Sequence, residues 1–291
     1  MLINIRYLII TVISIFLALG IGILVGAQLD SQSIILKQQK SLIEKVEAKF
    51  DELNQANVEL ENEIKRLKEE NDKKETYIKN IFPDYIKDKL KGMNVIVIET
   101  SEDYVYTGIK QVLKMSGAQV SGLRITDKIM AIGEEEKSEL VTHFGLSANQ
   151  DIASFIVKNL ADDVAGGKVE DINYLREKGF IETQDTFAGP VNYVVMAGGS
   201  REKTDKHEIV DIALIREFKK RSIPVVGVET VDAANSYMDY YKGEKISTVD
   251  NVDTVIGQTS LVLVLSGKKG NFGVKKTASA LMPFVSEEGN R

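Results

Sequence analysis

The chain has 291 residues, of which 43% are hydrophobic and 27% charged, a composition typical of a folded globular protein. Its formal net charge of −6 argues against a nucleic-acid-binding protein, because no excess of Lys and Arg is available to neutralise phosphates. The absence of cysteine excludes disulfides, thiolate metal sites and a cysteine nucleophile.

An apolar segment long enough to span a membrane opens the chain. Residues 7–29 contain no charged side chain, and a helix of that length extends about 34 Å, enough to cross a hydrocarbon core of about 30 Å. We therefore predict a single transmembrane helix. Arg6 precedes the segment and Asp30 follows it. Because positive charge is retained in the cytoplasm, residues 1–6 are expected there and the bulk of the chain outside it, at the cell membrane.

Two further features of this segment bear on its role. Val25 and Ala27 form a small-residue site at which a signal peptide would be cleaved, but the apolar run exceeds the ~7–15 residues of a signal peptide, which favours an uncleaved anchor. Gly22 and Gly26 form a G-x-x-x-G pair, a spacing that lets two membrane helices approach closely. We therefore interpret these glycines as a helix-packing site in the membrane.

A long helical stalk is predicted after the anchor. No glycine or proline occurs between Gly26 and Pro83, and apolar residues repeat every seven positions across residues 31–81, a period typical of coiled coils. A helix of this length extends about 75 Å. With Ile64 at heptad position a, the a and d positions expected in a dimer interface are Leu36, Ile43, Val46, Phe50, Leu53, Asn57, Leu60, Ile64, Leu67, Asn71 and Ile78.

Two asparagines indicate how the helices would associate. Asn57 and Asn71 occupy a positions while d positions beside them are Leu53, Leu60 and Leu67. This pattern selects parallel two-stranded coiled coils at some cost in stability. The chain is therefore predicted to form a homodimer through the stalk. The alternative is a single helix stabilised by its mixed charges; the strict heptad period favours the coiled coil.

An α/β domain is predicted for residues 92–291, after Phe82-Pro83-Asp84 ends the stalk. Short apolar segments typical of buried strands alternate with helical segments, which indicates a parallel sheet covered on both faces. We predict a doubly wound domain of Rossmann-like or flavodoxin-like type, outside the cytoplasm. The strands are expected at 94–99, 118–125, 191–197 and 225–229, and the helices at 104–115, 134–144, 151–165, 169–178 and 205–221; residues 259–265 fit either element.

Few residues of this domain carry a chemical signature. Gly198-Gly199-Ser200 follows a strand and precedes a helix, where a doubly wound fold binds anionic cofactors, but its spacing matches no dinucleotide or P-loop motif, so a structural turn is favoured. His143 and His207 fall on separate helices and are interpreted as surface residues. No catalytic residue is assigned, and we expect a non-enzymatic protein without a bound cofactor.

The C-terminal region contains two groups of charged residues. Asp250 and Asp253 are too few carboxylates to indicate a metal site, so none is predicted, and Asp253 is expected to cap a helix. The glycine-rich segment 267–276 is interpreted as a solvated basic loop, or as a contact for an anionic wall polymer or a partner. Its lysines are Lys268, Lys269, Lys275 and Lys276.

Several segments together resemble the MctB family. The resemblance lies in Ile5-Arg6-Tyr7 with the apolar segment after it, in the coil and the α/β domain, in 247–254 with Gly257, in 270–274 and in 281–283. It covers essentially the whole chain, and its more specific motifs contain Asp250, Asp253, Gly270 and Gly273. The family is labelled a copper transport protein, and the resemblance implies that function. A SteB-like branch implies instead control of a septal peptidoglycan hydrolase together with a membrane partner, SteA.

The residues favour the second of these functions. Copper(I) prefers thiolate, thioether and imidazole ligands, whereas the chain has no cysteine and its methionines are scattered, so most are expected to fill the core. We therefore expect a membrane-anchored dimer that acts as a scaffold or regulator of an envelope partner, such as a SteA-like protein or a wall hydrolase. The alternatives are copper transport and a small-molecule sensor whose ligand lies near Gly198 and Glu229.

Overall fold

The computed structural model of the protein describes residues 5–147, 150–185 and 189–284, with the backbone alone for 28–35 and for Thr107. Residues 1–4 of the predicted cytoplasmic segment 1–6 lie outside the described residues, as do the last residues of the predicted domain, 285–291. The chain divides into two compact units, Met1–Glu75 and Thr76–Arg291.

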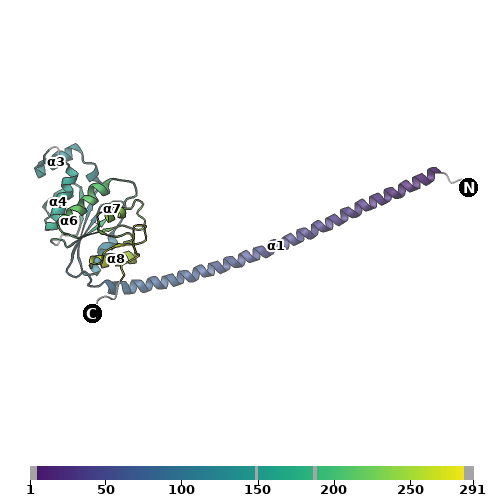
Figure 1. Cartoon of the computed structure of the whole chain (residues 1–291), viewed down its shortest axis with the longest axis horizontal. Coiled ribbons are helices and arrows are strands. Elements are labelled where there is room, and N and C mark those ends of the chain that lie inside the picture. Colours follow the sequence, from purple (N-terminus) through teal and green to yellow (C-terminus); the bar gives the residue numbers. More distant parts are fainter. Residues whose placement is uncertain (1–4, 148–149, 186–188, 285–291) are drawn as a thin grey trace. The chain divides into compact units, whose positions relative to one another are not determined.

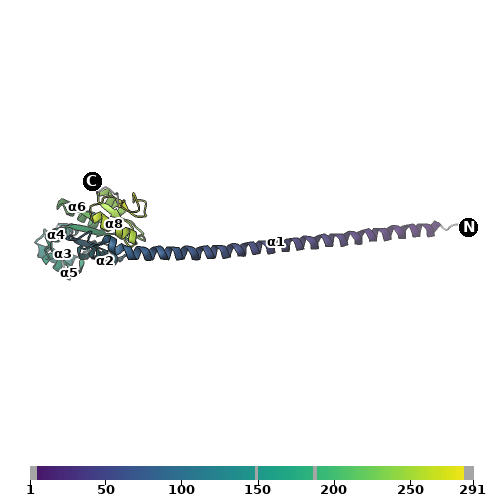
Figure 2. The ribbon, with the colours of Figure 1, turned by 90° about the horizontal axis from the view of Figure 1, so that it is seen from below.

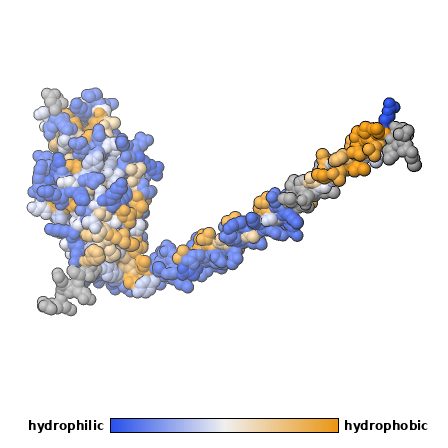
Figure 3. Space-filling model, turned by 45° about the vertical axis from the view of Figure 1, so that its right-hand side comes forward, coloured by the Kyte–Doolittle hydropathy of each residue, from blue (hydrophilic) through white to orange (hydrophobic). Residues whose placement is uncertain are grey.

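The first unit consists of most of one helix, α1 (Ile5–Ile86), drawn in purple and blue in Figure 1. Its residues Ile5–Ala27 form an apolar stretch of 23 residues, long enough to cross a membrane. Figure 3 shows this stretch as the strongly hydrophobic part of the helix. The predicted N-terminal apolar helix is therefore confirmed; residues 28 and 29, the last two of the predicted span, have no described side chains.

The C-terminal end of α1 differs from the prediction. The helix does not end at Phe82-Pro83-Asp84 but continues through Pro83 to Ile86. A proline removes one backbone donor and usually breaks a helix interior, but Pro83 lies in the last turn, where the Lys87 N–H still donates to the Pro83 carbonyl at 3.1 Å. Burial of the fully covered Ile86 side chain in the second unit stabilises this turn.

The second unit contains a seven-stranded sheet in the order β3-β2-β1-β4-β5-β6-β7, and only the β2–β3 pair is antiparallel. The strands are β1 (Asn94–Glu99), β2 (Gln119–Ile125), β3 (Ile181–Gln184), β4 (Tyr193–Ala197), β5 (Val225–Val228), β6 (Ser247–Val249) and β7 (Asn271–Phe272). Without β3, the chain moves from β1 to β2 on one side and then to β4 on the other, as in flavodoxin-like folds. The predicted mixed α/β domain with a mostly parallel sheet is confirmed.

Helices lie on both faces of the sheet (Figures 1 and 2). Successive residues of β1 point to opposite faces, so that Val95 and Val97 join one buried cluster with α2 and α8 while Ile96 and Ile98 join another with α4, α6 and α7. The elements are α2 (Thr107–Met115), η1 (Asp127–Met130), α3 (Glu134–Phe144), α4 (Ile152–Gly166), α5 (Glu170–Glu177), η2 (His207–Ile212), α6 (Ala213–Lys220), α7 (Met238–Gly243) and α8 (Val255–Leu265).

Some elements were not evident from the sequence. The strands β3, β6 and β7 have only four, three and two residues, too short to show a periodic pattern. Residues 259–265, which fit either element, belong to the helix α8. This helix is apolar on nearly all sides because it lies between α2, β5 and β6, so it lacks the amphipathic pattern of a surface helix.

One side chain of α7 lies directly on the sheet. Tyr241 is fully buried, and a Cβ atom added at Gly227 of β5 would lie 2.2 Å from its ring. A Cβ added at Gly198, just after β4, would lie 2.0 Å from its hydroxyl oxygen. Only glycine at both positions lets the tyrosine reach this depth.

We predict that Gly227→Ala destabilises the domain by about 1–3 kcal/mol, because the added methyl group overpacks a site that has no free volume. The free energy of unfolding is measured by urea titration, followed by the near-ultraviolet circular dichroism of the tyrosines. Gly243→Ala is the matched control, because no heavy atom lies within 4 Å of its added Cβ. Equal denaturation midpoints for the two variants would contradict the close contact.

Candidate functional site

The carboxyl ends of β1 and β4 meet at the point where the strand order reverses. Doubly wound folds bind their ligands in the crevice outside this point. Thr100 follows β1, and Gly198-Gly199-Ser200 follows β4, so the weak candidate cofactor site from the sequence lies at this position. Gly199 has a φ of +106°, which favours glycine, and the Ser200 hydroxyl donates to the Glu202 carbonyl at 2.7 Å.

The base of the crevice is a buried polar network around Asp211. This residue lies in η2, is fully buried, and its Oδ1 accepts hydrogen bonds from the hydroxyl groups of Tyr241 and of Thr100, the latter at 2.7 Å. Its Oδ2 has no partner. Burial raises the pKa of Asp211 to about 6. The element η2 is a π-helical segment, a rare conformation that recurs at functional sites.

Lys206 connects this network to the end of β2. Its side chain is only 4% exposed, and its ammonium group donates to the Ile125 carbonyl at 2.9 Å and to Asp127 at 2.6 Å. A buried ammonium is stable only with such partners. Lys206 therefore fixes the loop after β4 against the loop after β2, and it is not a free cation in the crevice.

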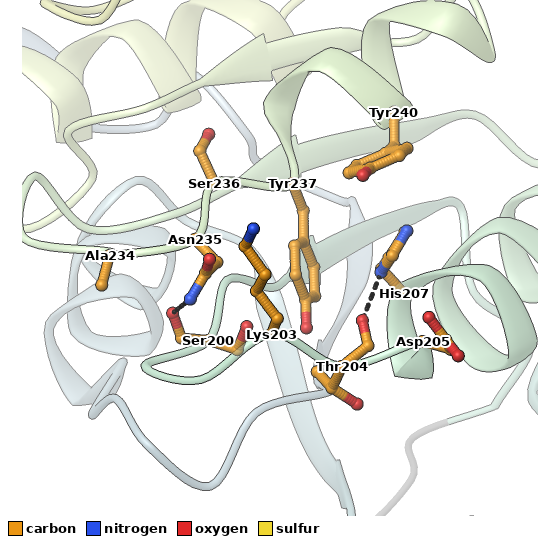
Figure 4. A pocket seen from close by; sticks show the side chains of 10 residues that line it. All are labelled: Ser200, Lys203, Thr204, Asp205, His207, Ala234, Asn235, Ser236, Tyr237 and Tyr240. Atoms are coloured by element: carbon orange, nitrogen blue, oxygen red, sulfur yellow. Dashed lines mark hydrogen bonds between the residues drawn. The ribbon is translucent and has the colours of Figure 1, made fainter.

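Two adjoining cavities occupy the crevice, with volumes of about 300 and 540 Å³. They share Ser200, Lys203, Thr204 and Tyr237 as lining residues. The smaller cavity is bordered mainly by the loops after β1, β2 and β4. The larger one, drawn in Figure 4, lies between the start of η2 and the segment from Ala234 to Tyr240. Both volumes fall in or near the range of ~300–1,000 Å³ that holds small molecules.

The two histidines occupy different environments. His143 is exposed and stacks on Tyr174 with ring centroids 3.5 Å apart, as expected for a surface residue. The same expectation is wrong for His207, which is half-buried, lines the larger cavity and lies 4.0 Å from the Tyr240 ring. The sequence did not predict this because Tyr240 comes from α7, far along the chain.

Comparison with known proteins identifies the family. A family model described as "Copper transport outer membrane protein, MctB" matches residues 2–283. The chain belongs to the MctB family. A search of curated proteins gives no significant match.

Asp250 and Gly273, two of the residues that carried the resemblance to the MctB family, have a structural role. The buried carboxylate of Asp250 accepts backbone N–H bonds from Val274 at 2.7 Å and from Lys275 at 3.0 Å. A Cβ at Gly273 would lie 1.8 Å from Asp250 Oδ1, so only glycine lets the loop approach. Gly270, with a φ of +151°, starts the same loop. The contact ties the C-terminal loop of this MctB-family chain to the end of β6.

This loop places Lys275 inside the domain. Its ammonium group donates at 2.6 Å to Glu229, which is fully buried at the end of β5, and at 3.0 Å to the Thr230 carbonyl. Burial raises the pKa of Glu229. The prediction of a solvated loop is therefore wrong for Lys275, whereas Lys268, Lys269 and Lys276 are exposed.

The role predicted for Asp253 is also wrong. The cap of α8 is Thr254, whose hydroxyl oxygen accepts from the Gly257 N–H at 3.1 Å. Asp253 instead accepts from the Val231 N–H at 2.9 Å, joining the loops after β5 and β6. Both residue types are good helix caps, so only the backbone conformation determines which of the two residues caps α8.

Potential metal ligands are dispersed in this MctB-family chain. Within the described residues, no three His, Asp or Glu side chains are grouped so that they could hold a metal ion. Met196 and Met238 are fully buried in the core, and Met93 and Met130 pack against the two buried clusters. The prediction that most methionines fill the core is confirmed.

The predicted coiled-coil positions form a second candidate site, in the first unit and at the end of α1. Gly22 and Gly26 have open space where a Cβ would lie. Asn57 is exposed, and the Asn71 amide donates to Glu75 at 3.0 Å. The apolar interface positions are between 41% and 69% exposed; they are Leu36, Ile43, Val46, Phe50, Leu53, Leu60, Ile64, Leu67 and Ile78.

We predict that Asp211 makes the domain less stable as the pH rises from about 4 to about 6. Its pKa is about 6 in the folded state and ~3.9 in an unfolded chain. The folded protein therefore binds the proton more tightly than the unfolded chain. Across this pH range the free energy of unfolding falls by about 3 kcal/mol. Asp211→Asn removes this dependence, so the stability of the variant relative to the wild type should rise by a similar amount between pH 4 and pH 7.

Urea unfolding of both proteins at several pH values provides the measurement. The buried Asp163, whose pKa is also raised by burial to about 6, titrates equally in both proteins and cancels in the difference. Parallel pH profiles of wild type and variant would contradict the assignment.

Proposed function

We propose that the chain is a membrane-anchored homodimer that acts as a non-enzymatic scaffold or regulator of a protein partner in the cell envelope. The observation that carries the proposal is the row of exposed apolar side chains along α1, which repeats at a and d positions over residues 36–78. In a single helix this row of apolar side chains would stay exposed to water, whereas a second helix would bury it.

The energetics favour association. Burying one large aliphatic or aromatic side chain contributes about 1.5–3 kcal/mol. Nine such positions on each helix outweigh an association cost of about 4–15 kcal/mol. The second chain is the natural partner because it carries the same heptad pattern in the same register.

A parallel arrangement is favoured by two independent features. Asn57 and Asn71 at a positions favour parallel two-stranded coils, in which each asparagine faces its twin. Two chains anchored in one bilayer through Ile5–Ala27 also have their stalks leaving the membrane in the same direction. Gly22 and Gly26 would then let the anchors themselves pack together.

A scaffold is preferred to an enzyme because the buried polar groups of the crevice serve the fold. Asp211 is held by Thr100 and Tyr241, and Glu229 is held by Lys275. For the partner, the resemblance to the SteB-like branch favours a wall hydrolase system with a SteA-like membrane protein.

We predict that Leu60→Asp weakens the dimer at least tenfold, because it places two carboxylates opposite each other at a d position. The full chain in phospholipid nanodiscs is examined by chemical crosslinking and by mass photometry. Asn62→Asp is the matched control, since it introduces the same side chain at the outward-facing f position of the same heptad. Equal dimer fractions for the two variants would contradict the coiled coil.

The role in the envelope is tested in a deletion strain of the source cell. We predict a defect in cell separation or wall turnover that is restored by the wild type and by Asn62→Asp. Leu60→Asp, and a deletion of residues 43–77 that removes five whole heptads, should fail to restore it. Normal function of the deletion variant would overturn the proposal.

Copper transport, the function in the family description, is the competing function. It predicts that the strain becomes sensitive to copper and that the chain binds Cu(I) with a defined stoichiometry against a competing chelator. On the scaffold proposal, the wall defect appears without added copper and the titration gives no stoichiometric binding. Stoichiometric Cu(I) binding that is required for complementation would replace the proposal.

A further inference from the structure

The larger cavity of the crevice is partly walled by aromatic rings. His207 lies with its ring centroid 4.0 Å from that of Tyr240 and 5.2 Å from that of Tyr237. Tyr240 is half exposed, whereas Tyr237 is almost fully buried. Figure 4 shows the three side chains on the same side of the cavity. The His207 and Tyr240 rings are tilted by 37° to each other, and this wall offers a solvent-accessible aromatic surface to a ligand.

His207 also presents a hydrogen-bond acceptor. Its Nδ1 lies 2.8 Å from the Thr204 carbonyl oxygen. A carbonyl oxygen only accepts, so Nδ1 carries the proton and the neutral ring keeps its lone pair on Nε2. Within the described residues, Nε2 has no hydrogen-bond partner.

The remaining wall is polar, and several of its groups are free. In the described part of the chain, the Lys203 ammonium, the Asp205 carboxylate, the Tyr240 hydroxyl and the side-chain oxygen of Asn235 line the cavity without a hydrogen-bond partner. Asn235 is held in place by its amide, which donates to the Arg201 carbonyl at 2.8 Å. The cavity therefore offers both hydrogen-bond donors and acceptors, of which Asn235 is held in position.

These features select the chemical class of the ligand. An apolar ligand would leave the polar groups without partners, which costs free energy. An anion would meet the Asp205 carboxylate, and a cation would meet Lys203. A molecule that has an apolar face, many hydroxyl groups and no charge satisfies all of these groups.

We propose that this cavity binds a neutral saccharide whose ring lies against Tyr240 and His207. Its hydroxyl groups donate to His207 Nε2, Asp205 and Asn235, and accept from Lys203. The volume of about 540 Å³ is of the size that holds a small-molecule ligand. The inference does not depend on the proposed scaffold role or on dimer formation.

The test uses the full chain in phospholipid nanodiscs, because maltoside detergents would themselves present a sugar. Glucose, galactose, mannose, N-acetylglucosamine and their disaccharides are offered as probes in saturation-transfer NMR. We expect at least one of them to bind with a Kd on the order of 1 mM or tighter. Tyr240→Ala should weaken that binding at least tenfold, while Tyr85→Ala, a substitution of another partly exposed tyrosine outside the cavity, leaves it unchanged.

Three results would overturn the inference. One is the absence of binding by every saccharide to a domain that remains folded by circular dichroism. Another is binding that Tyr240→Ala does not weaken, which would place the sugar elsewhere. The third is displacement of the bound saccharide by inorganic phosphate, which would identify an anion site. The Leu60→Asp variant should bind the saccharide normally, so failure of the dimer and failure of the sugar site are distinguishable.

Discussion

The contact of Tyr241 with the sheet is the constraint on which the carboxyl edge of the domain depends. Its ring fills the space above Gly227, and its hydroxyl reaches below Gly198 to Asp211. A side chain at either glycine would displace the ring and with it the hydrogen bond. Because Tyr106 also donates to the Gly198 carbonyl at 2.6 Å, the turn after β4 is fixed from two sides. These contacts fix the base of the crevice.

The C-terminal loop repeats this principle at the other end of the same edge. Asp250 accepts two backbone N–H bonds from a loop that approaches closely at Gly273, and the loop then delivers Lys275 to the buried Glu229. A buried carboxylate without such a cation would be costly. This family motif therefore stabilises the fold beside the crevice.

Local patterns were sufficient for the longer elements, but not for the shortest strands or for the contacts between elements. The alternation of apolar strands and helices predicted the parallel sheet, and the turn at Gly198 was placed correctly between a strand and a helix. The roles of Tyr241 and Asp211 were not predictable, because they meet residues that are distant in the sequence. Strands as short as β7 show no periodic pattern in the sequence. Asp253 and Thr254 are adjacent and both suit a helix cap, so only the backbone geometry shows that α8 is capped by Thr254. The length of α1 was underestimated because burial of Ile86 outweighs the effect of Pro83.

Copper transport, as in the family description, and the proposed scaffold role require different residues of this chain. Direct copper transport needs soft ligands that can exchange an ion along a path. Met196 and Met238 are buried and could not bind an exchanging ion unless the core opened. Met93 and Met130 pack against the two buried clusters on opposite faces of the sheet. Among the described residues, one helical stretch, Ile5–Ala27, is long and apolar enough to cross a membrane. If the proposed scaffold acts in copper homeostasis, a partner supplies the ligands and the pathway.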